Sequence, residues 1–280
     1  MQVESLAEQL FFTTVRIDTI AQSGAPGSGT GFFFAYKAGE VNYPFVVTNK
    51  HVVMGMLKGA LSLLQSQGQH PKLGHGFRLA IDSWQDAWFG HPSPDIDIAI
   101  CPFAQLEAHV KRQYGIDLFY RYVPNGIIPS EEELANLDAI ESVTFIGYPN
   151  GIWDSKNLLP VARRGTTASL IHVDFENTPR FLIDASVFGG SSGSPVFVMN
   201  QGMFTQKSGG TNFGCSRLLF VGVIAGVFFR TQLNQIVAVP IPTQVQPMVQ
   251  QQEMIDLGIV FKARTVVETV EAFLKARNVT

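Results

Sequence analysis

The most constraining feature of this 280-residue chain is the stretch VFGGSSGSPVF, which runs from Val187 to Phe197. Glycine and serine are typical of surface loops, yet the segments on both sides, FLIDASVF and PVFVM, have the pattern of buried strands. Two interpretations are open. Either the stretch is an awkward hairpin, or its backbone is bent so that it presents one hydroxyl group.

The composition favours a β-rich globular protein. Hydrophobic residues make up 46% of the chain, phenylalanine occurs 22 times, and runs of Val and Ile outnumber segments with helical spacing. The length allows one large core or two cores of ordinary domain size. The formal net charge of -3 shows no basic bias, so neither a nucleic-acid partner nor a membrane is expected.

Cysteine usage and the first residues bear on cofactors and location. Neither Cys101 nor Cys215 has the spacing of a metal ligand, so we expect no metal, no other cofactor and two reduced thiols. Glu4 and Glu8 stand near the start without early Lys or Arg, and no apolar run is long enough to cross a membrane. We therefore expect a cytoplasmic protein, unless an export signal precedes this sequence.

Apolar alternation predicts strands along most of the chain. The segments are GFFFAY, YPFVVT, FRLAIDSW, DIDIAICPF, ESVTFIGYP, TTASLIHVDF, RFLIDASVF, PVFVM, LLFVGVIAGVFF and QIVAVPI. Helical spacing predicts helices in 54–68, 103–115 and 265–276, and capping-box patterns begin at Ser130 and at Thr265. The last helix is amphipathic and is expected to pack against the body, although a partner surface remains possible.

The stretch GSGTG, residues 27–31, could cradle a phosphate, but that function needs a helix directly after the glycines. Here a strand follows, and no lysine stands where a phosphate loop requires one. The pattern therefore favours a flexible entry to an edge strand.

A candidate base and a candidate carboxylate stand at strand ends. His51 follows Thr48, Asn49 and Lys50, at the point where a strand ends in a turn. The simpler interpretation is a packed side chain without a catalytic role, which is usual for a histidine among apolar residues. Asp97 leads into the apolar run Ile98 to Ile100, with Asp95 two residues earlier. A carboxylate at the start of a buried strand needs a hydrogen-bonding partner, and a histidine N–H is a suitable one. The simpler interpretation is that the carboxylates are solvated at a strand edge.

These candidates explain the opening stretch. Acyl transfer needs a hydroxyl, a base, a carboxylate that orients the base, and two backbone N–H groups for the oxyanion. Ser192 alone among the three serines of the stretch lies in Gly-x-Ser-Gly-x-Pro. Gly189 and Gly190 allow positive φ angles, and Gly193 is expected to leave space beside the nucleophile. The sequence therefore predicts that Ser192 is a nucleophile and that the N–H groups of Gly190 and Ser192 form an oxyanion hole.

TNKHVV, DIAI, GGSSGSPVF, FIGYPNG and FVGVIAG together resemble the motifs of trypsin-like serine proteases of the chymotrypsin fold. The similarity is greatest to the bacterial branch of glutamyl endopeptidases and high-temperature-requirement proteases, and it extends from about Gly27 to Pro242. His51, Asp97 and Ser192 stand in the triad order of that fold. Their separations along the sequence are close to those of the triad in chymotrypsin, which are about 45 residues from His to Asp and about 93 from Asp to Ser.

The resemblance implies an all-β fold of two six-stranded antiparallel Greek-key barrels with short helical insertions, at 54–68 and 103–139, and a C-terminal helix. Residues 1–140 are expected to form the barrel that carries His51 and Asp97. Residues 141–245 are expected to form the barrel that carries Ser192, and 246–280 a tail with the helix. The implied activity is hydrolysis of protein or peptide substrates through an acyl-enzyme at the cleft between the barrels.

The sequence also departs from the family patterns. Ser191 replaces the aspartate that secreted digestive relatives pair with a new N-terminus, so that activation switch is absent. The resemblance places Ser186 at the base of the specificity pocket and Ala225, Gly226 and Val227 in its wall, without the histidine of glutamyl endopeptidases and without a charge. We therefore expect a small or medium apolar residue before the cut bond.

Two further hypotheses concern activity. A catalytically silent, protease-like binding module is the alternative to an enzyme, although every triad residue is present. An enzyme held latent until a regulatory protein or peptide arrives is the other hypothesis, with an insertion or the terminal helix closing the cleft. An α/β-hydrolase is excluded because Pro195 and a strand, rather than a helix, follow Ser192.

Overall fold

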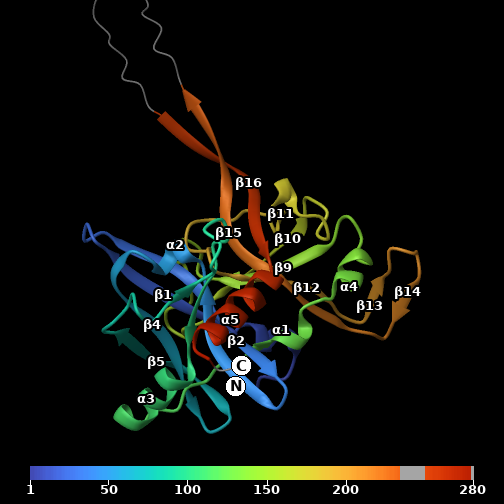
Figure 1. Cartoon of the computed structure of the whole chain (residues 1–280). Coiled ribbons are helices and arrows are strands. Elements are labelled where there is room, and N and C mark those ends of the chain that lie inside the picture. The colour runs from blue at the N-terminus through green and yellow to red at the C-terminus, as the bar shows by residue number, and fades with distance from the viewer. Residues whose placement is uncertain (234–249, 279–280) are drawn as a thin grey trace, which may run out of the picture.

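The computed structural model describes residues 1–233 and 250–278 of the chain (Figure 1). The helices are α1 (Leu6–Leu10), α2 (Lys50–Val53), α3 (Ala104–Tyr114), α4 (Glu131–Ala135) and α5 (Arg264–Ala276), and the 3-10 turns are η1 (Asn125–Ile127), η2 (Pro149–Gly151) and η3 (Phe175–Asn177). The strands of the first half are β1 (Thr14–Ala21), β2 (Pro26–Ala38), β3 (Val41–Thr48), β4 (Met56–Gln67), β5 (His70–Ile81), β6 (Phe89–Gly90), β7 (Ala99–Pro102) and β8 (Val123–Pro124). Those of the second half are β9 (Ser142–Gly147), β10 (Val161–Thr167), β11 (Arg180–Asp184), β12 (Pro195–Asn200), β13 (Met203–Thr205), β14 (Thr211–Phe213), β15 (Arg217–Leu233) and β16 (Gln250–Lys262).

The first half folds into one curved sheet in the order β5-β4-β1-β2-β3-β7-β6, and β8 pairs with β2. Five of these strands have eight or more residues, β7 has four, and β6 and β8 have two each. Alternating side chains of β1, β2, β3 and β4 fill the interior, because successive residues of a strand face opposite sides. This half is the barrel-like domain that the sequence predicts.

The second half forms a closed barrel of six strands in the order β10-β11-β16-β15-β12-β9. Strand β16 lies within the range that the sequence analysis assigns to a tail, yet it pairs with both β11 and β15. Without it the barrel would have two open edges, so the tail range supplies a structural strand. The all-β fold class and the C-terminal helix are confirmed.

One predicted helix is wrong, because residues 56–67 form strand β4. Leu57, Leu61 and Leu64 have helical spacing, but Leu61 and Leu63 both point into the core of the first half. Pairing with β1 and β5 on either side stabilises the extended form. A turn at Gly68, whose φ of 62° suits glycine, leads from β4 into β5.

The remaining helix predictions hold apart from one cap. Helices α3, α4 and α5 are present, and Ser130 and Glu133 form the predicted capping box of α4. The second capping box is absent, because the Thr265 hydroxyl is buried and donates to the carbonyl of Lys262. The strand predicted at 166–175 ends at Thr167, and QIVAVPI at 235–241 lies outside the described residues.

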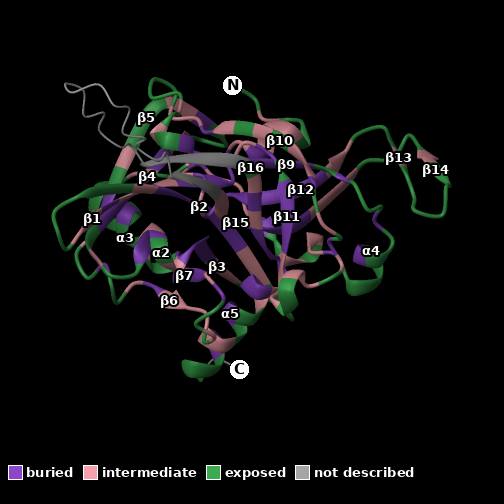
Figure 2. Cartoon of the chain, turned by 90° about the horizontal axis from the view of Figure 1, so that it is seen from above, coloured by how far each residue is buried: buried purple, intermediate pink, exposed green. Residues whose placement is uncertain are grey.

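Helix α5 packs into the core between the two halves. Its residues Val266, Val270 and Leu274 join a cluster that contains side chains of β2 and β3 from the first half and of β12 and β15 from the second. Figure 2 shows buried residues along the strands at the centre of the molecule, with α5 beside them. The helix is therefore part of the core. Within the described residues, no helix is long and apolar enough to cross a membrane.

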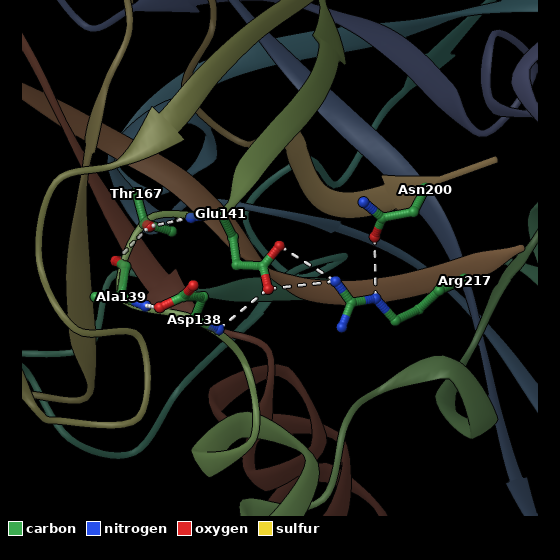
Figure 3. Close-up of polar contacts among 6 residues, drawn as sticks. All are labelled: Asp138, Ala139, Glu141, Thr167, Asn200 and Arg217. Atoms are coloured by element: carbon green, nitrogen blue, oxygen red, sulfur yellow. Dashed lines mark hydrogen bonds and ion pairs between the residues drawn. The ribbon is translucent and has the colours of Figure 1, made fainter. Parts of the chain in front are cut away.

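A partly buried ion pair fastens one end of the second barrel (Figure 3). Glu141, just before β9, accepts two hydrogen bonds of 3.3 and 3.2 Å from Arg217 at the start of β15. Arg217 also donates to Asn200 at the end of β12, and the Glu141 N–H donates to Thr167 at the end of β10. Burial of a charge is tolerated when it is paired and hydrogen-bonded in this way. The network thus joins four strands of the barrel.

Candidate active site

His51 lies in α2, the single helical turn that follows β3. Val52 and Val53 of the same turn are buried in the core of the first half. Because these two side chains anchor the turn, the His51 side chain faces outward, and 49% of it is exposed. An imidazole that is exposed in this way can exchange protons with solvent or with a bound molecule.

Asp97 is positioned by its two neighbours. Ile96 and Ile98 are both buried in the core between the two halves. Since they anchor the backbone on either side, the Asp97 side chain can face the surface, where it is 26% exposed. The carbonyl of Asp97 accepts a hydrogen bond of 2.6 Å from the buried side chain of Asn49, which holds the segment against the end of β3.

The structure brings His51 and Asp97 together. One carboxylate oxygen of Asp97 lies 2.5 Å from Nδ1 of His51, and the other accepts a hydrogen bond of 3.1 Å from the His51 backbone N–H. A carboxylate only accepts hydrogen bonds, so Nδ1 carries a proton and Nε2 of the neutral ring is left as an acceptor. This is the tautomer that a general base requires.

A lysine adds positive charge near this pair. Lys50 donates a hydrogen bond of 2.6 Å to the carbonyl of Ser93. Burial lowers the pKa of Lys50, while the attraction of Asp97 and Asp95 opposes that shift. Asn49 and Lys50 adjoin His51 in the sequence. The carbonyls that accept their hydrogen bonds, those of Asp97 and Ser93, lie in a loop more than 40 residues away.

The three serines of the opening stretch differ in exposure. Ser191 and Ser194 are buried, and no hydrogen-bond partner for their hydroxyls is found among the described residues. Ser192 is half-buried and lies at the turn between them. Of the three, Ser192 is thus the only one that is partly exposed.

Two glycines shape this turn. The predicted positive φ is confirmed at Gly190 but is wrong for Gly189, and Gly193 has a positive φ instead. Gly190 has a φ of 83° and Gly193 a φ of 88°, a region that other residues rarely adopt. A Cβ on Gly193 would overlap the carbonyl of Thr30, and one on Gly190 would approach the carbonyl of Tyr148. The turn therefore packs too closely on the neighbouring backbone for any side chain at these two positions.

The orientation of two peptide groups bears on the predicted oxyanion hole. The Gly189 carbonyl accepts from the N–H of Asn150, and the Ser191 carbonyl accepts from the N–H of Ser194. In a trans peptide the N–H points opposite to the carbonyl, so the N–H groups of Gly190 and Ser192 point away from these partners. Neither N–H donates a hydrogen bond to another described residue.

The turn contacts the first half of the chain through β2. The N–H of Thr30 donates a hydrogen bond of 2.9 Å to the Ser192 carbonyl. Thr48, which lies three residues before His51, donates to the Thr30 carbonyl and lies beside Gly193. The segment of Ser192 and the segment of His51 therefore meet at one place, although no hydrogen bond joins the Ser192 hydroxyl to the His51 ring in the described residues.

The predicted pocket residues lie in the second barrel. Ser186 follows β11, and Ala225, Gly226 and Val227 belong to β15; all four are half-buried. The register between β15 and β16 shifts between Ile224 and Gly226, which bends the strand there. None of the four predicted residues carries a charge.

A family model for the trypsin-like peptidase domain matches residues 29–204, well over half of the chain. The chain belongs to the trypsin-like peptidase family. The resemblance of its motifs to this family is thereby confirmed, and the match includes His51, Asp97 and Ser192.

Several solved structures of low sequence identity are similar to this trypsin-like peptidase. The HtrA-type protease AlgW with tripeptide has a TM-score of 0.50 at 11% identity, and the alignment covers 96% of this chain and 62% of that one. The thermostable serine protease AL20 from an extremophilic microorganism has 0.48 at 14%, with 94% and 97% covered. The MamO protease domain from Magnetospirillum magneticum has 0.45 at 12%, again with 94% and 97% covered. No curated protein sequence matches significantly.

Both cysteines of the peptidase are free thiols. Cys101 is buried in β7, and burial raises its pKa to about 12. Because the thiolate is the reactive form of cysteine, Cys101 is not a competing nucleophile.

Proposed function

We propose that this trypsin-like peptidase is a serine endopeptidase whose nucleophile is Ser192, with His51 as the general base and Asp97 as its orienting partner. The observation that carries the proposal is the 2.5 Å contact between Nδ1 of His51 and the Asp97 carboxylate. That contact leaves Nε2 free to accept a proton on the exposed side of the ring. The positions of Ser191 and Ser194, both buried, support Ser192 as the hydroxyl that reacts.

In the proposed reaction, Ser192 Oγ attacks the carbonyl carbon of a peptide bond and passes its proton to Nε2 of His51. The carbonyl oxygen becomes an oxyanion, which the N–H groups of Gly190 and Ser192 stabilise. The C–N bond then breaks as His51 donates the proton to the leaving amine. A water molecule repeats the sequence on the acyl ester and regenerates the Ser192 hydroxyl.

We propose that the residue before the cut bond is small or medium-sized and apolar. The four half-buried pocket residues, Ser186, Ala225, Gly226 and Val227, offer no charge for an acidic or basic side chain. Peptide libraries should therefore show the highest kcat/KM with residues such as Ala or Val before the cut bond. A preference for Glu, Lys or Arg at that position would contradict the proposal.

We further propose that the isolated enzyme is latent and that a regulatory protein or peptide partner activates it in the cytoplasm. The missing hydrogen bond between the Ser192 hydroxyl and the His51 ring supports a resting state. Helix α5 is a poor lid, because Val266, Val270 and Leu274 are core residues. Immediate and complete reaction of the isolated protein with an active-site titrant would contradict latency.

The test of the main proposal is covalent labelling with a fluorophosphonate probe, which reacts with activated serine hydroxyls. The adduct should map by peptide mass spectrometry to Ser192. A protein that remains unlabelled after prolonged exposure, or labels elsewhere, would instead favour a catalytically silent binding module.

A further inference from the structure

The GSGTG segment has a position that its sequence does not predict. Residues 26–31 of β2 pair with β1 on one side, whereas pairing with β3 begins only at Phe32. The other edge of this part of β2 is thus not covered by β3. It is covered by the turn that contains Ser192, and Thr30 is completely buried there. The last three residues of the segment, 29–31, are therefore buried and are not part of a flexible entry.

All the polar groups of Thr30 are hydrogen-bonded at this contact. Its N–H donates to the Ser192 carbonyl at 2.9 Å, and its carbonyl accepts from the Thr48 hydroxyl at 2.6 Å. Its own hydroxyl donates to the Gly190 carbonyl at 2.8 Å and accepts from the Tyr148 N–H at 3.1 Å. A threonine hydroxyl has one donor and can accept, so both functions are in use.

These contacts hold the turn at two points. The Gly190 carbonyl is fixed by the Thr30 hydroxyl, and the Ser192 carbonyl is fixed by the Thr30 N–H. The two carbonyls belong to the peptide groups before Ser191 and after Ser192, so the bonds hold the backbone on both sides of the Ser191–Ser192 peptide group. This held backbone carries the Ser192 side chain and the Ser192 N–H.

We propose that Thr30 is a positioning residue whose hydroxyl aligns the Ser192 turn for catalysis. This inference rests on the proposed function of Ser192, but it assigns Thr30 no contact with substrate. Misplacement of a reacting group by about 1 Å can lower the rate by about 100-fold, so a hydroxyl that only aligns the turn has a measurable effect.

Three variants separate this role from a merely structural one. Thr30→Val and Thr30→Ala both remove the hydroxyl, and Ala does so without adding a methyl group near the Gly190 carbonyl. Both should lower kcat roughly 10- to 100-fold with KM changed by less than about twofold, because ground-state binding does not depend on the turn. Thr30→Ser keeps the hydroxyl and should restore kcat to within about threefold of the wild type.

The control is Thr13→Val. Thr13 is buried and its hydroxyl donates a hydrogen bond of 2.8 Å to the Leu10 carbonyl, so this variant also loses one buried hydrogen bond. It is expected to leave kcat unchanged. The proposal is overturned if folded Thr30→Ala has wild-type kcat, if Thr30→Ser is as impaired as Thr30→Ala, or if Thr13→Val lowers kcat equally.

A measurement without turnover makes the test independent of the proposed function. In Thr30→Ala, the amide hydrogens of residue 30 and Tyr148 should exchange faster with solvent, since their acceptors are the turn carbonyl and the lost hydroxyl. Thr13→Val should not change these two rates. If the wild type never reacts with substrate or probe, the proposed function fails, while unchanged exchange in Thr30→Ala would overturn the role of Thr30.

Discussion

Replacement of Ser192 by alanine is expected to lower kcat by about 10⁶-fold, the loss found when the nucleophile of a serine protease triad is removed. Neither neighbour can replace it, because the hydroxyls of Ser191 and Ser194 are buried. Alanine fits the turn, since the half-buried Ser192 has an ordinary backbone conformation and not the positive φ of Gly190 and Gly193. The measurement is steady-state hydrolysis of a fluorogenic peptide, with the concentrations of both proteins determined from their absorbance.

Ser194→Ala is the matched control for this loss. It removes a hydroxyl two residues away in the same turn, and that hydroxyl has no hydrogen-bond partner in the described residues. Its kcat should stay within a few-fold of the wild type, because no charge or proton passes through it. If Ser194→Ala lost activity while Ser192→Ala kept it, the assignment of the nucleophile would be wrong.

Asp97→Asn is expected to lower kcat by about 10⁴-fold while leaving the fold intact. Both carboxylate oxygens of Asp97 accept from His51, one from Nδ1 and one from the backbone N–H. An asparagine amide directed at Nδ1 donates instead, so the ring proton moves to Nε2 and the base can no longer accept from Ser192. Stopped-flow acylation and circular dichroism together would separate this loss from unfolding.

Asp95→Asn tests whether position 97 is special. Asp95 lies two residues earlier and is exposed, and within the described residues it has no ion pair. Its replacement should change kcat by less than about threefold, because an exposed charge interacts only weakly with its surroundings. Equal losses in the two variants would mean that net negative charge near Lys50, and not the bond to His51, governs the rate.

The candidate site was largely predictable because its residues stand at element ends. His51 follows a strand that ends in a turn, and the glycines around Ser192 break a buried pattern where no loop is expected. The role of Thr30 was not predictable, because its partners Gly190 and Tyr148 lie more than 100 residues away. Locally, the same glycine-rich letters indicate a mobile loop.

The wrong predictions of local structure arise where one sequence pattern is compatible with two structures. Leu57, Leu61 and Leu64 match helical spacing, and only the pairing of β4 with β1 and β5 selects the strand. Thr265 begins a pattern that usually caps a helix, but the core buries it, so its hydroxyl bonds backward to Lys262. In both cases tertiary packing outweighs local preference.

The packing of α5 has a consequence for synthesis on the ribosome. Val266, Val270 and Leu274 complete the cluster in which Ile96 and Ile98 are anchored, and Asp97 stands between those two isoleucines. The helix is translated after both barrels, so the growing polypeptide carries every reactive group before it carries the residues that steady Asp97. The cluster around Ile96 and Ile98 can therefore be completed only once residue 276 has left the exit tunnel.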